Sequence, residues 1–159
     1  MKKLFWPLFL LAAWFVHGQQ LFAQSRLIPW VMRHQMQIYA GDSTACDAYT
    51  DDVEVTLWAE ERKGHWEVEG GKAELCDYYR HASAAYVLLG ASVHTEFADF
   101  SVQRGGFPWT EAKLRYTATI TLTAPNLPEM HIQAQDELKL VRSLLGVKIK
   151  ALESRTDER

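Results

Sequence analysis

Apolar and polar residues alternate along much of the chain, and this period of two is typical of β-strands with one buried face. The alternation is clearest over 113–123, where one face holds only apolar side chains and the other mainly threonine, lysine and arginine. Weaker alternation predicts strands at 30–40, 52–60, 66–69, 72–76 and 130–140. Asp136 interrupts the apolar face of the last of these, and 144–152 fits either a strand or a helix broken by Gly146.

The longest apolar stretch is 84–103, which we interpret as strand. Its phase slips near Ala98 and Asp99, which predicts a β-bulge or bend, and Gly90 marks a second break that would divide it in two. Gly70 and Gly71 offer the positive φ that a tight hairpin needs. Together these segments predict an antiparallel β-sandwich of about seven to eight strands, with a small closed, lipocalin-like β-barrel as the alternative.

The N-terminal segment has the features of a signal peptide. Lys2 and Lys3 precede thirteen apolar residues at 4–16, a length that suits a signal peptide better than a membrane span of about 20 residues. We expect cleavage after Ala23, with Gly18 as the second choice, and an uncleaved N-terminal anchor as the alternative. The predicted organisation is a signal peptide at 1–23, one β-domain at 24–152 and a charged, flexible tail at 153–159, in a periplasmic or secreted protein without a stable membrane span after cleavage.

Cys46 and Cys76 are the two cysteines of the chain. In an oxidising compartment, two cysteines without a Cys-x-x-Cys motif or an adjacent histidine favour one structural disulfide. Closing a loop of this length contributes about 3–4 kcal/mol in the chain-entropy model.

Charge is distributed unevenly along the chain. Acidic residues (20) outnumber lysine and arginine (17), which excludes a strongly basic nucleic-acid-binding protein. Between Asp42 and Asp77, eleven acidic residues face three basic ones, a local net charge of −8. The outward parity of 52–60 combines Glu54 and Glu60 with Trp58, so this face is a candidate binding surface for a cationic partner.

Motifs that would indicate an enzyme are missing from the sequence. No nucleophile elbow, zinc-protease helix or phosphate-binding glycine loop occurs, and the histidines have no ligand-like spacing. We therefore predict no catalytic residues, cofactor or metal. A second candidate contact is the loop containing Phe107 and Trp109, because exposed aromatic rings favour binding surfaces.

These observations favour a non-enzymatic protein-binding module of the bacterial envelope, such as an inhibitor, an immunity factor or an assembly factor. The alternative is a carrier that encloses a small apolar ligand, which would need an internal apolar cavity of a few hundred Å³.

Overall fold

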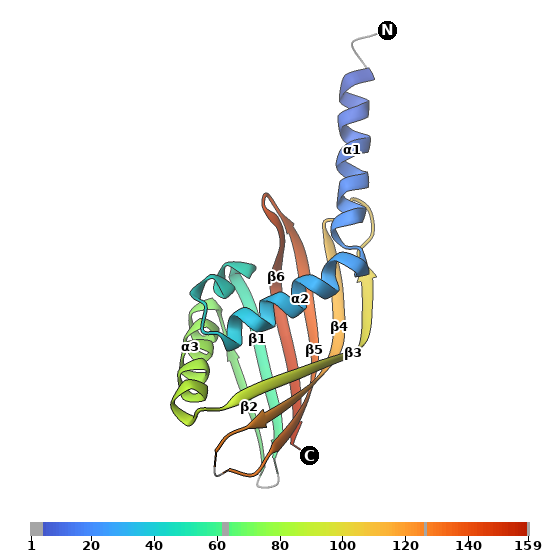
Figure 1. Ribbon diagram of the computed structural model, residues 1–159. Coiled ribbons are helices and arrows are strands. Elements are labelled where there is room, and N and C mark those ends of the chain that lie inside the picture. Colours follow the sequence, from blue (N-terminus) through green and yellow to red (C-terminus); the bar gives the residue numbers. More distant parts are fainter. Residues whose placement is uncertain (1–4, 62–63, 126, 159) are drawn as a thin grey trace.

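The body of the domain is one open sheet with the strand order β2-β1-β6-β5-β4-β3 (Figure 1). Every neighbouring pair is antiparallel except β1 and β6, which run parallel. The predicted seven-to-eight-strand antiparallel sandwich is therefore wrong, and so is the closed barrel. The strands are β1 (Tyr49–Glu61), β2 (Gly64–Gly70), β3 (Ser92–Arg104), β4 (Glu111–Thr123), β5 (Met130–Ser143) and β6 (Gly146–Glu158).

The structure is a computed structural model. It describes the backbone of residues 5–61, 64–125 and 127–158, and the side chains of these residues apart from 5–12, 60–61, 64–66 and 158. The helical elements are α1 (Phe5–Leu21), α2 (Gln24–Tyr39), the short 3₁₀-helix η1 (Ser43–Ala48) and α3 (Lys72–Leu89). Among the described residues, no helix is both long and apolar enough to cross a membrane.

Helix α2 occupies the segment for which we predicted a strand at 30–40. Its buried residues Leu27, Val31, His34 and Ile38 are spaced by three or four positions, which places them on one face of a helix. The weak alternation of this segment matched a strand only by chance. Helix α2 crosses one face of the sheet diagonally (Figure 1).

Helix α3 replaces the strand predicted at 72–76 and the first part of the stretch at 84–103. The Glu74 carboxylate accepts a hydrogen bond from the Gly71 backbone N–H at 3.0 Å, which caps the first turn. Gly90 ends the helix with a φ of 60°. The break at Gly90 is therefore real, but it separates a helix from β3. The predicted bulge is confirmed, because the register of β3 against β4 shifts between Ala98 and Ser101.

The C-terminal segment predicted to be a flexible tail belongs to the sheet. Strand β6 continues to Glu158, and residues 153–157 pair with β1 on one side and β5 on the other. Of the two interpretations of 144–152, the strand is correct from Gly146 onward. Leu144 and Leu145 form the turn between β5 and β6.

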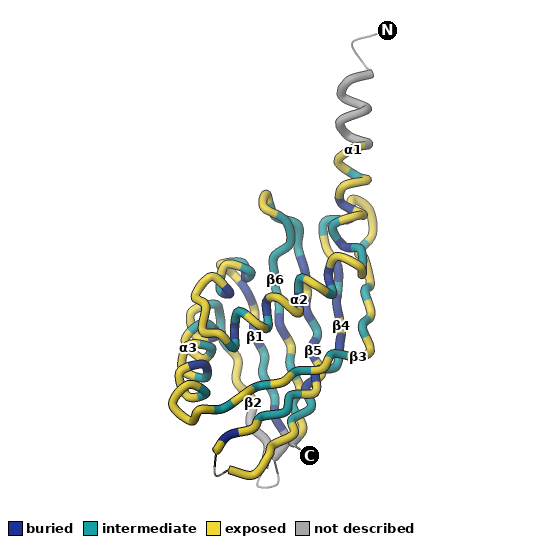
Figure 2. Tube along the Cα trace, viewed as in Figure 1, coloured by how far each residue is buried: buried dark blue, intermediate teal, exposed yellow. Residues whose placement is uncertain are grey.

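The core lies between the concave, helix-facing side of the sheet and helices α2 and α3, where Figure 2 shows buried residues on the central strands. The predicted disulfide is confirmed: Cys46 in η1 is bonded to Cys76 in α3. Phe22 is fully buried in this core. Cleavage after Ala23 would therefore remove a core side chain, whereas cleavage after Gly18 would retain it. The signal peptide itself stays a prediction.

Candidate functional site

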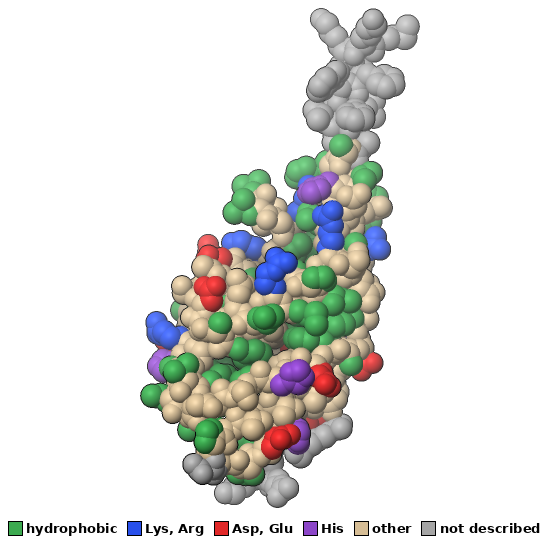
Figure 3. Space-filling model, viewed as in Figure 1, with side chains coloured by type: hydrophobic (Ala, Val, Ile, Leu, Met, Phe, Trp, Pro, Cys, Tyr) green, Lys and Arg blue, Asp and Glu red, His purple; other side chains and the backbone are tan. Residues whose placement is uncertain are grey.

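A cavity of about 410 Å³ lies between the inner face of the sheet and helices α2 and α3. Its walls are mainly apolar and aromatic. On the space-filling surface, apolar side chains gather between α2 and β3 (Figure 3). The apolar walls are formed largely by alternate residues of β4 and β5, namely Ile120, Leu122, Met130, Ile132, Ala134 and Leu138.

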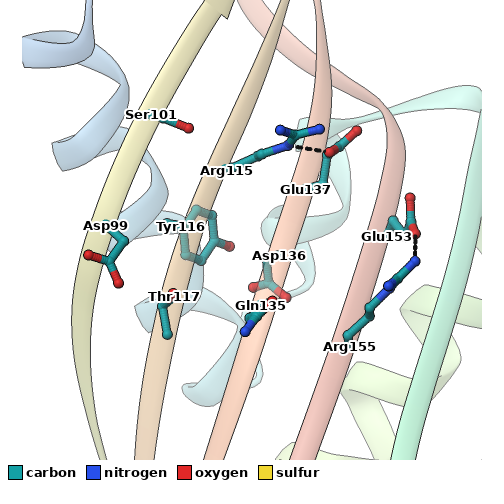
Figure 4. A pocket seen from close by; sticks show the side chains of 10 residues that line it. All are labelled: Asp99, Ser101, Arg115, Tyr116, Thr117, Gln135, Asp136, Glu137, Glu153 and Arg155. Atoms are coloured by element: carbon teal, nitrogen blue, oxygen red, sulfur yellow. Dashed lines mark hydrogen bonds and ion pairs between the residues drawn. The ribbon is translucent and has the colours of Figure 1, made fainter.

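Asp136 is the carboxylate in this apolar lining. It follows Ala134 by two positions in β5, so its side chain faces the helices, and only 8% of the residue is exposed. Ser154 in β6, the register partner of Asp136, donates its hydroxyl to the carboxylate at 2.6 Å. The Tyr116 and Asp136 side chains point toward each other in Figure 4.

Burial raises the pKa of Asp136, while the hydroxyl groups of Ser154 and Tyr116 act in the opposite direction. Gln35 of α2 extends this network, because its amide donates to the Tyr116 hydroxyl at 3.4 Å. The carboxyl group holds its proton to higher pH than an exposed aspartate does. In its protonated form it offers a ligand a hydrogen-bond donor.

A second polar network begins at His34 of α2. Its Nε2 lies 3.0 Å from the Tyr49 hydroxyl, which in turn lies 2.9 Å from the Tyr79 hydroxyl. Burial lowers the pKa of His34 from its ordinary 6.5 to about 4. The imidazole is therefore neutral at physiological pH. Trp30, one helical turn earlier, stacks on the ring and holds it against the sheet.

The cavity thus combines an apolar body with two polar groups: a buried carboxyl with a raised pKa and a neutral imidazole. Such a set can orient a molecule that has a hydrogen-bonding group and an apolar skeleton. Both groups can also exchange protons with a bound molecule. Within the part of the chain that the structure describes, no cluster of three or more His, Cys, Asp or Glu side chains has the arrangement of a metal site.

The opposite face of the sheet carries a polar groove instead (Figure 4). Here Arg115 pairs with Glu137, and Arg155 pairs with Glu153. The first pair joins β4 to β5 and the second lies within β6, and Asp99 also lines the groove, which is polar and lacks the apolar walls of the cavity. It is a less favourable binding site than the cavity on the helical side.

The residues proposed from the sequence lie outside the cavity. Glu54 is exposed and Trp58 is half-buried, both on the outward face of β1, whereas the Glu60 side chain lies outside the described residues. Phe107 is exposed and Trp109 half-buried in the loop between β3 and β4. Strands β5 and β6 separate the two sets. They do not form one surface, and a binding role for either set stays a prediction.

Sequence reasoning missed the cavity because its lining combines strand residues with residues of α2 and α3, two helices that were not predicted from the sequence. The one available signal was Asp136, an acidic residue in the apolar parity of an otherwise regular strand. A buried acid in such a position requires partners or a function. Tyr116 and His34 carried no comparable signal, since tyrosine is common in strands and the helix containing His34 was read as a strand.

Comparison with known proteins identifies the fold. No protein-family model matches the sequence, and no characterised protein matches it at a significant level. Many solved structures superimpose on this chain, and three of them illustrate the likeness. The β subunit of benzoate 1,2-dioxygenase from Burkholderia mallei has a TM-score of 0.65 at 11% identity, covering 85% of this chain and 91% of that one.

Two further matches come from Novosphingobium aromaticivorans. An NTF2-like protein with a cystatin-like fold has a TM-score of 0.59 at 12% identity, covering 84% of this chain and 89% of that one. A putative scytalone dehydratase has a TM-score of 0.58 at 16% identity, covering 82% and 80%. At these identities the likeness concerns the fold alone, and the chain has an NTF2-like fold.

Proposed function

We propose that this protein binds a small, largely apolar organic molecule in the cavity between the sheet and helices α2 and α3, with a hydrogen-bond acceptor of the ligand directed at Asp136 and Tyr116. The observation that carries the proposal is a buried, hydrogen-bonded carboxyl group in an otherwise apolar cavity of about 410 Å³. A carboxyl group in this position lowers the stability of the fold, because burial opposes its ionisation. Its presence there therefore supports a functional role. A neutral ligand with a carbonyl group matches both the apolar walls and the donor that the protonated Asp136 carboxyl offers.

Proton transfer on the bound molecule is a second candidate function. It is favoured by the pairing of Asp136, whose pKa is raised by burial, with the neutral His34 in the same cavity. A structurally similar protein is named as a putative scytalone dehydratase. Dehydration of a bound alcohol is therefore the reaction class to test first.

Binding is tested with the neutral naphthyl ketone Prodan (6-propionyl-2-dimethylaminonaphthalene), whose emission shifts to the blue in apolar surroundings. We expect blue-shifted, saturable emission with the wild-type protein. Ile120→Trp should weaken binding about tenfold or more, because Ile120 lines the cavity and the larger ring fills it. Thr119→Trp is the matched control, since Thr119 is the preceding residue of β4 and is exposed on the other face.

The role of Asp136 is tested by the pH dependence of the same titration. Wild-type binding should weaken as the pH rises through the pKa of Asp136, because ionisation removes a donor and places a charge beside the ketone. Asp136→Asn, which cannot ionise, should lose this dependence. Equal binding by Ile120→Trp and wild type would refute the cavity as the binding site.

The outward face of β1, with Glu54 and Trp58, stays a separate proposal for a cationic protein partner. Export to the periplasm or the medium is likewise a proposal, supported by the Cys46–Cys76 disulfide.

A further inference from the structure

The turn between β5 and β6 has a composition that hairpin geometry does not explain. Short hairpin loops favour Asn, Asp and Gly because these residues accommodate the turn and are readily hydrated. Here the turn residues are Leu144 and Leu145, with relative exposures of 102% and 99%. Leucine side chains in this position gain no packing energy within the domain. Two adjacent, fully exposed leucines at a projecting tip therefore point to a contact outside the chain.

The strands leading to this tip are basic. Residues 139–150 contain Lys139, Arg142, Lys148 and Lys150 and no acidic residue. Lys139 pairs with Glu111 at 3.4 Å and Lys150 with Asp52 at 3.2 Å, further from the turn. Nearest the tip, Arg142 and Lys148 form no ion pair with the described residues. Figure 3 shows apolar side chains at the tip and cationic ones below them.

Other apolar side chains gather at the same end of the molecule. The Arg142 guanidinium lies 3.6 Å from the centre of the Trp14 ring in α1. The next residue, Phe15, packs against Phe107 with ring centroids 4.8 Å apart, and Phe107 is itself 70% exposed. Helix α1 leaves the domain at this end (Figure 1). The hairpin tip and the aromatic loop therefore lie at the same end of the molecule, and they remain there if the predicted signal peptide is cleaved.

We propose that this end of the molecule docks on an anionic lipid surface, with Leu144 and Leu145 inserted among the lipid headgroups and Arg142 and Lys148 against the phosphates. Apolar tips flanked by cations are the combination that binds such interfaces. A protein groove would accommodate the leucines, but nothing in it requires the flanking positive charge. The docking surface is separate from the ligand cavity, so it does not depend on the proposed ligand.

The test places an environment-sensitive nitrobenzoxadiazole label at Leu145→Cys in the full chain. The described residues contain no free cysteine, so the added thiol reacts selectively. We expect a several-fold rise and a blue shift of the emission with vesicles of equal parts phosphatidylcholine and phosphatidylglycerol, and quenching by lipids spin-labelled near the headgroup. A label at Thr119→Cys, exposed on β4 toward its other end, should not respond.

Unlabelled variants separate the tip from α1 as the source of binding. The double variant Leu144→Ser, Leu145→Ser should lower partitioning onto anionic vesicles about tenfold, and Lys148→Gln about fivefold. Leu127→Ser, an exposed leucine in the β4–β5 loop, should leave it unchanged. Circular dichroism confirms that each variant is folded.

Three outcomes would overturn the proposal: a Leu145 label that stays aqueous while the chain binds vesicles, unchanged partitioning of the double serine variant, or a blue shift that depends on protein concentration without lipid. The last outcome would identify a second copy of the chain as the occupant. Prodan binding should be the same in the double serine variant and the wild type, which keeps this test distinct from that of the cavity.

Discussion

Lowering the pH should destabilise the protein through His34. The residue is 5% exposed, and burial lowers its pKa from 6.5 to about 4 in the folded state. The unfolded chain therefore binds a proton at His34 more readily than the native state does between these two values. The free energy of unfolding is therefore unaffected by titration of His34 above pH 6.5, and it falls as the pH decreases from 6.5 toward the native pKa of about 4.

The size of the effect follows from the difference between the two pKa values. Each pH unit corresponds to about 1.4 kcal/mol, so the free energy of unfolding should fall by about 3 kcal/mol between neutral pH and pH 4 from this residue alone. That loss is a large fraction of the stability of a domain of this size. It is well above the error of a denaturation experiment.

The measurement is urea unfolding followed by far-ultraviolet circular dichroism at a series of pH values, for wild type and His34→Gln. Glutamine does not titrate, and its amide can still donate to the Tyr49 hydroxyl. The exposed histidines are shared by both proteins, so their titration cancels in the difference. The free energy of unfolding of the wild type minus that of His34→Gln should fall by about 3 kcal/mol between neutral pH and pH 4. A difference that stays constant with pH would show that His34 is solvated in the native state, and the reasoning would fail.

Three further results are expected. The raised native pKa of Asp136 makes the wild-type free energy of unfolding fall as the pH rises above 3.8, so Asp136→Asn should remove this part of the pH dependence. The same urea series measures it, and identical pH profiles of wild type and variant would contradict the assignment. Replacing both cysteines by serine should lower the free energy of unfolding by about 3–4 kcal/mol without changing the circular dichroism spectrum, and an unchanged unfolding midpoint would count against a stabilising disulfide. Leu140→Ala should cost about 2–5 kcal/mol because Leu140 is fully buried, while Lys139→Ala on the other face of β5 should change stability by about 0.5 kcal/mol or less; equal losses would mean that both faces are buried.

The sequence carried good information on strands that have one solvated face. Over 112–119 and 134–140 the alternation of residue types matches the alternation of burial except at Asp136, and the bulge near Asp99 was visible as a slip of phase. Such patterns reflect local geometry, so they are readable without knowing what packs against the strand.

Sequence reasoning failed where a short segment fits both the strand period of two residues and the helix period of 3.6, and where segments distant in the sequence meet. Short windows such as 72–76 contain too few apolar residues to separate a period of two from one of 3.6. Only the structure shows that Gly71 and Gly90 are the two ends of helix α3. The cavity depends on Asp136, Tyr116 and His34, which come from β5, β4 and α2. Their meeting is a consequence of sheet order and helix docking, which periodicity does not encode.

The position of β6 has a consequence for how the protein is made. It is the last strand of the chain, yet it lies inside the sheet between β1 and β5. Until β6 is synthesised, β1 and β5 each present an unpaired edge, and the pairing of β6 with β1 closes a loop that spans most of the domain. The sheet is therefore completed only after β6 has left the ribosome, so the nascent protein depends on whatever protects its open edges from aggregation until then.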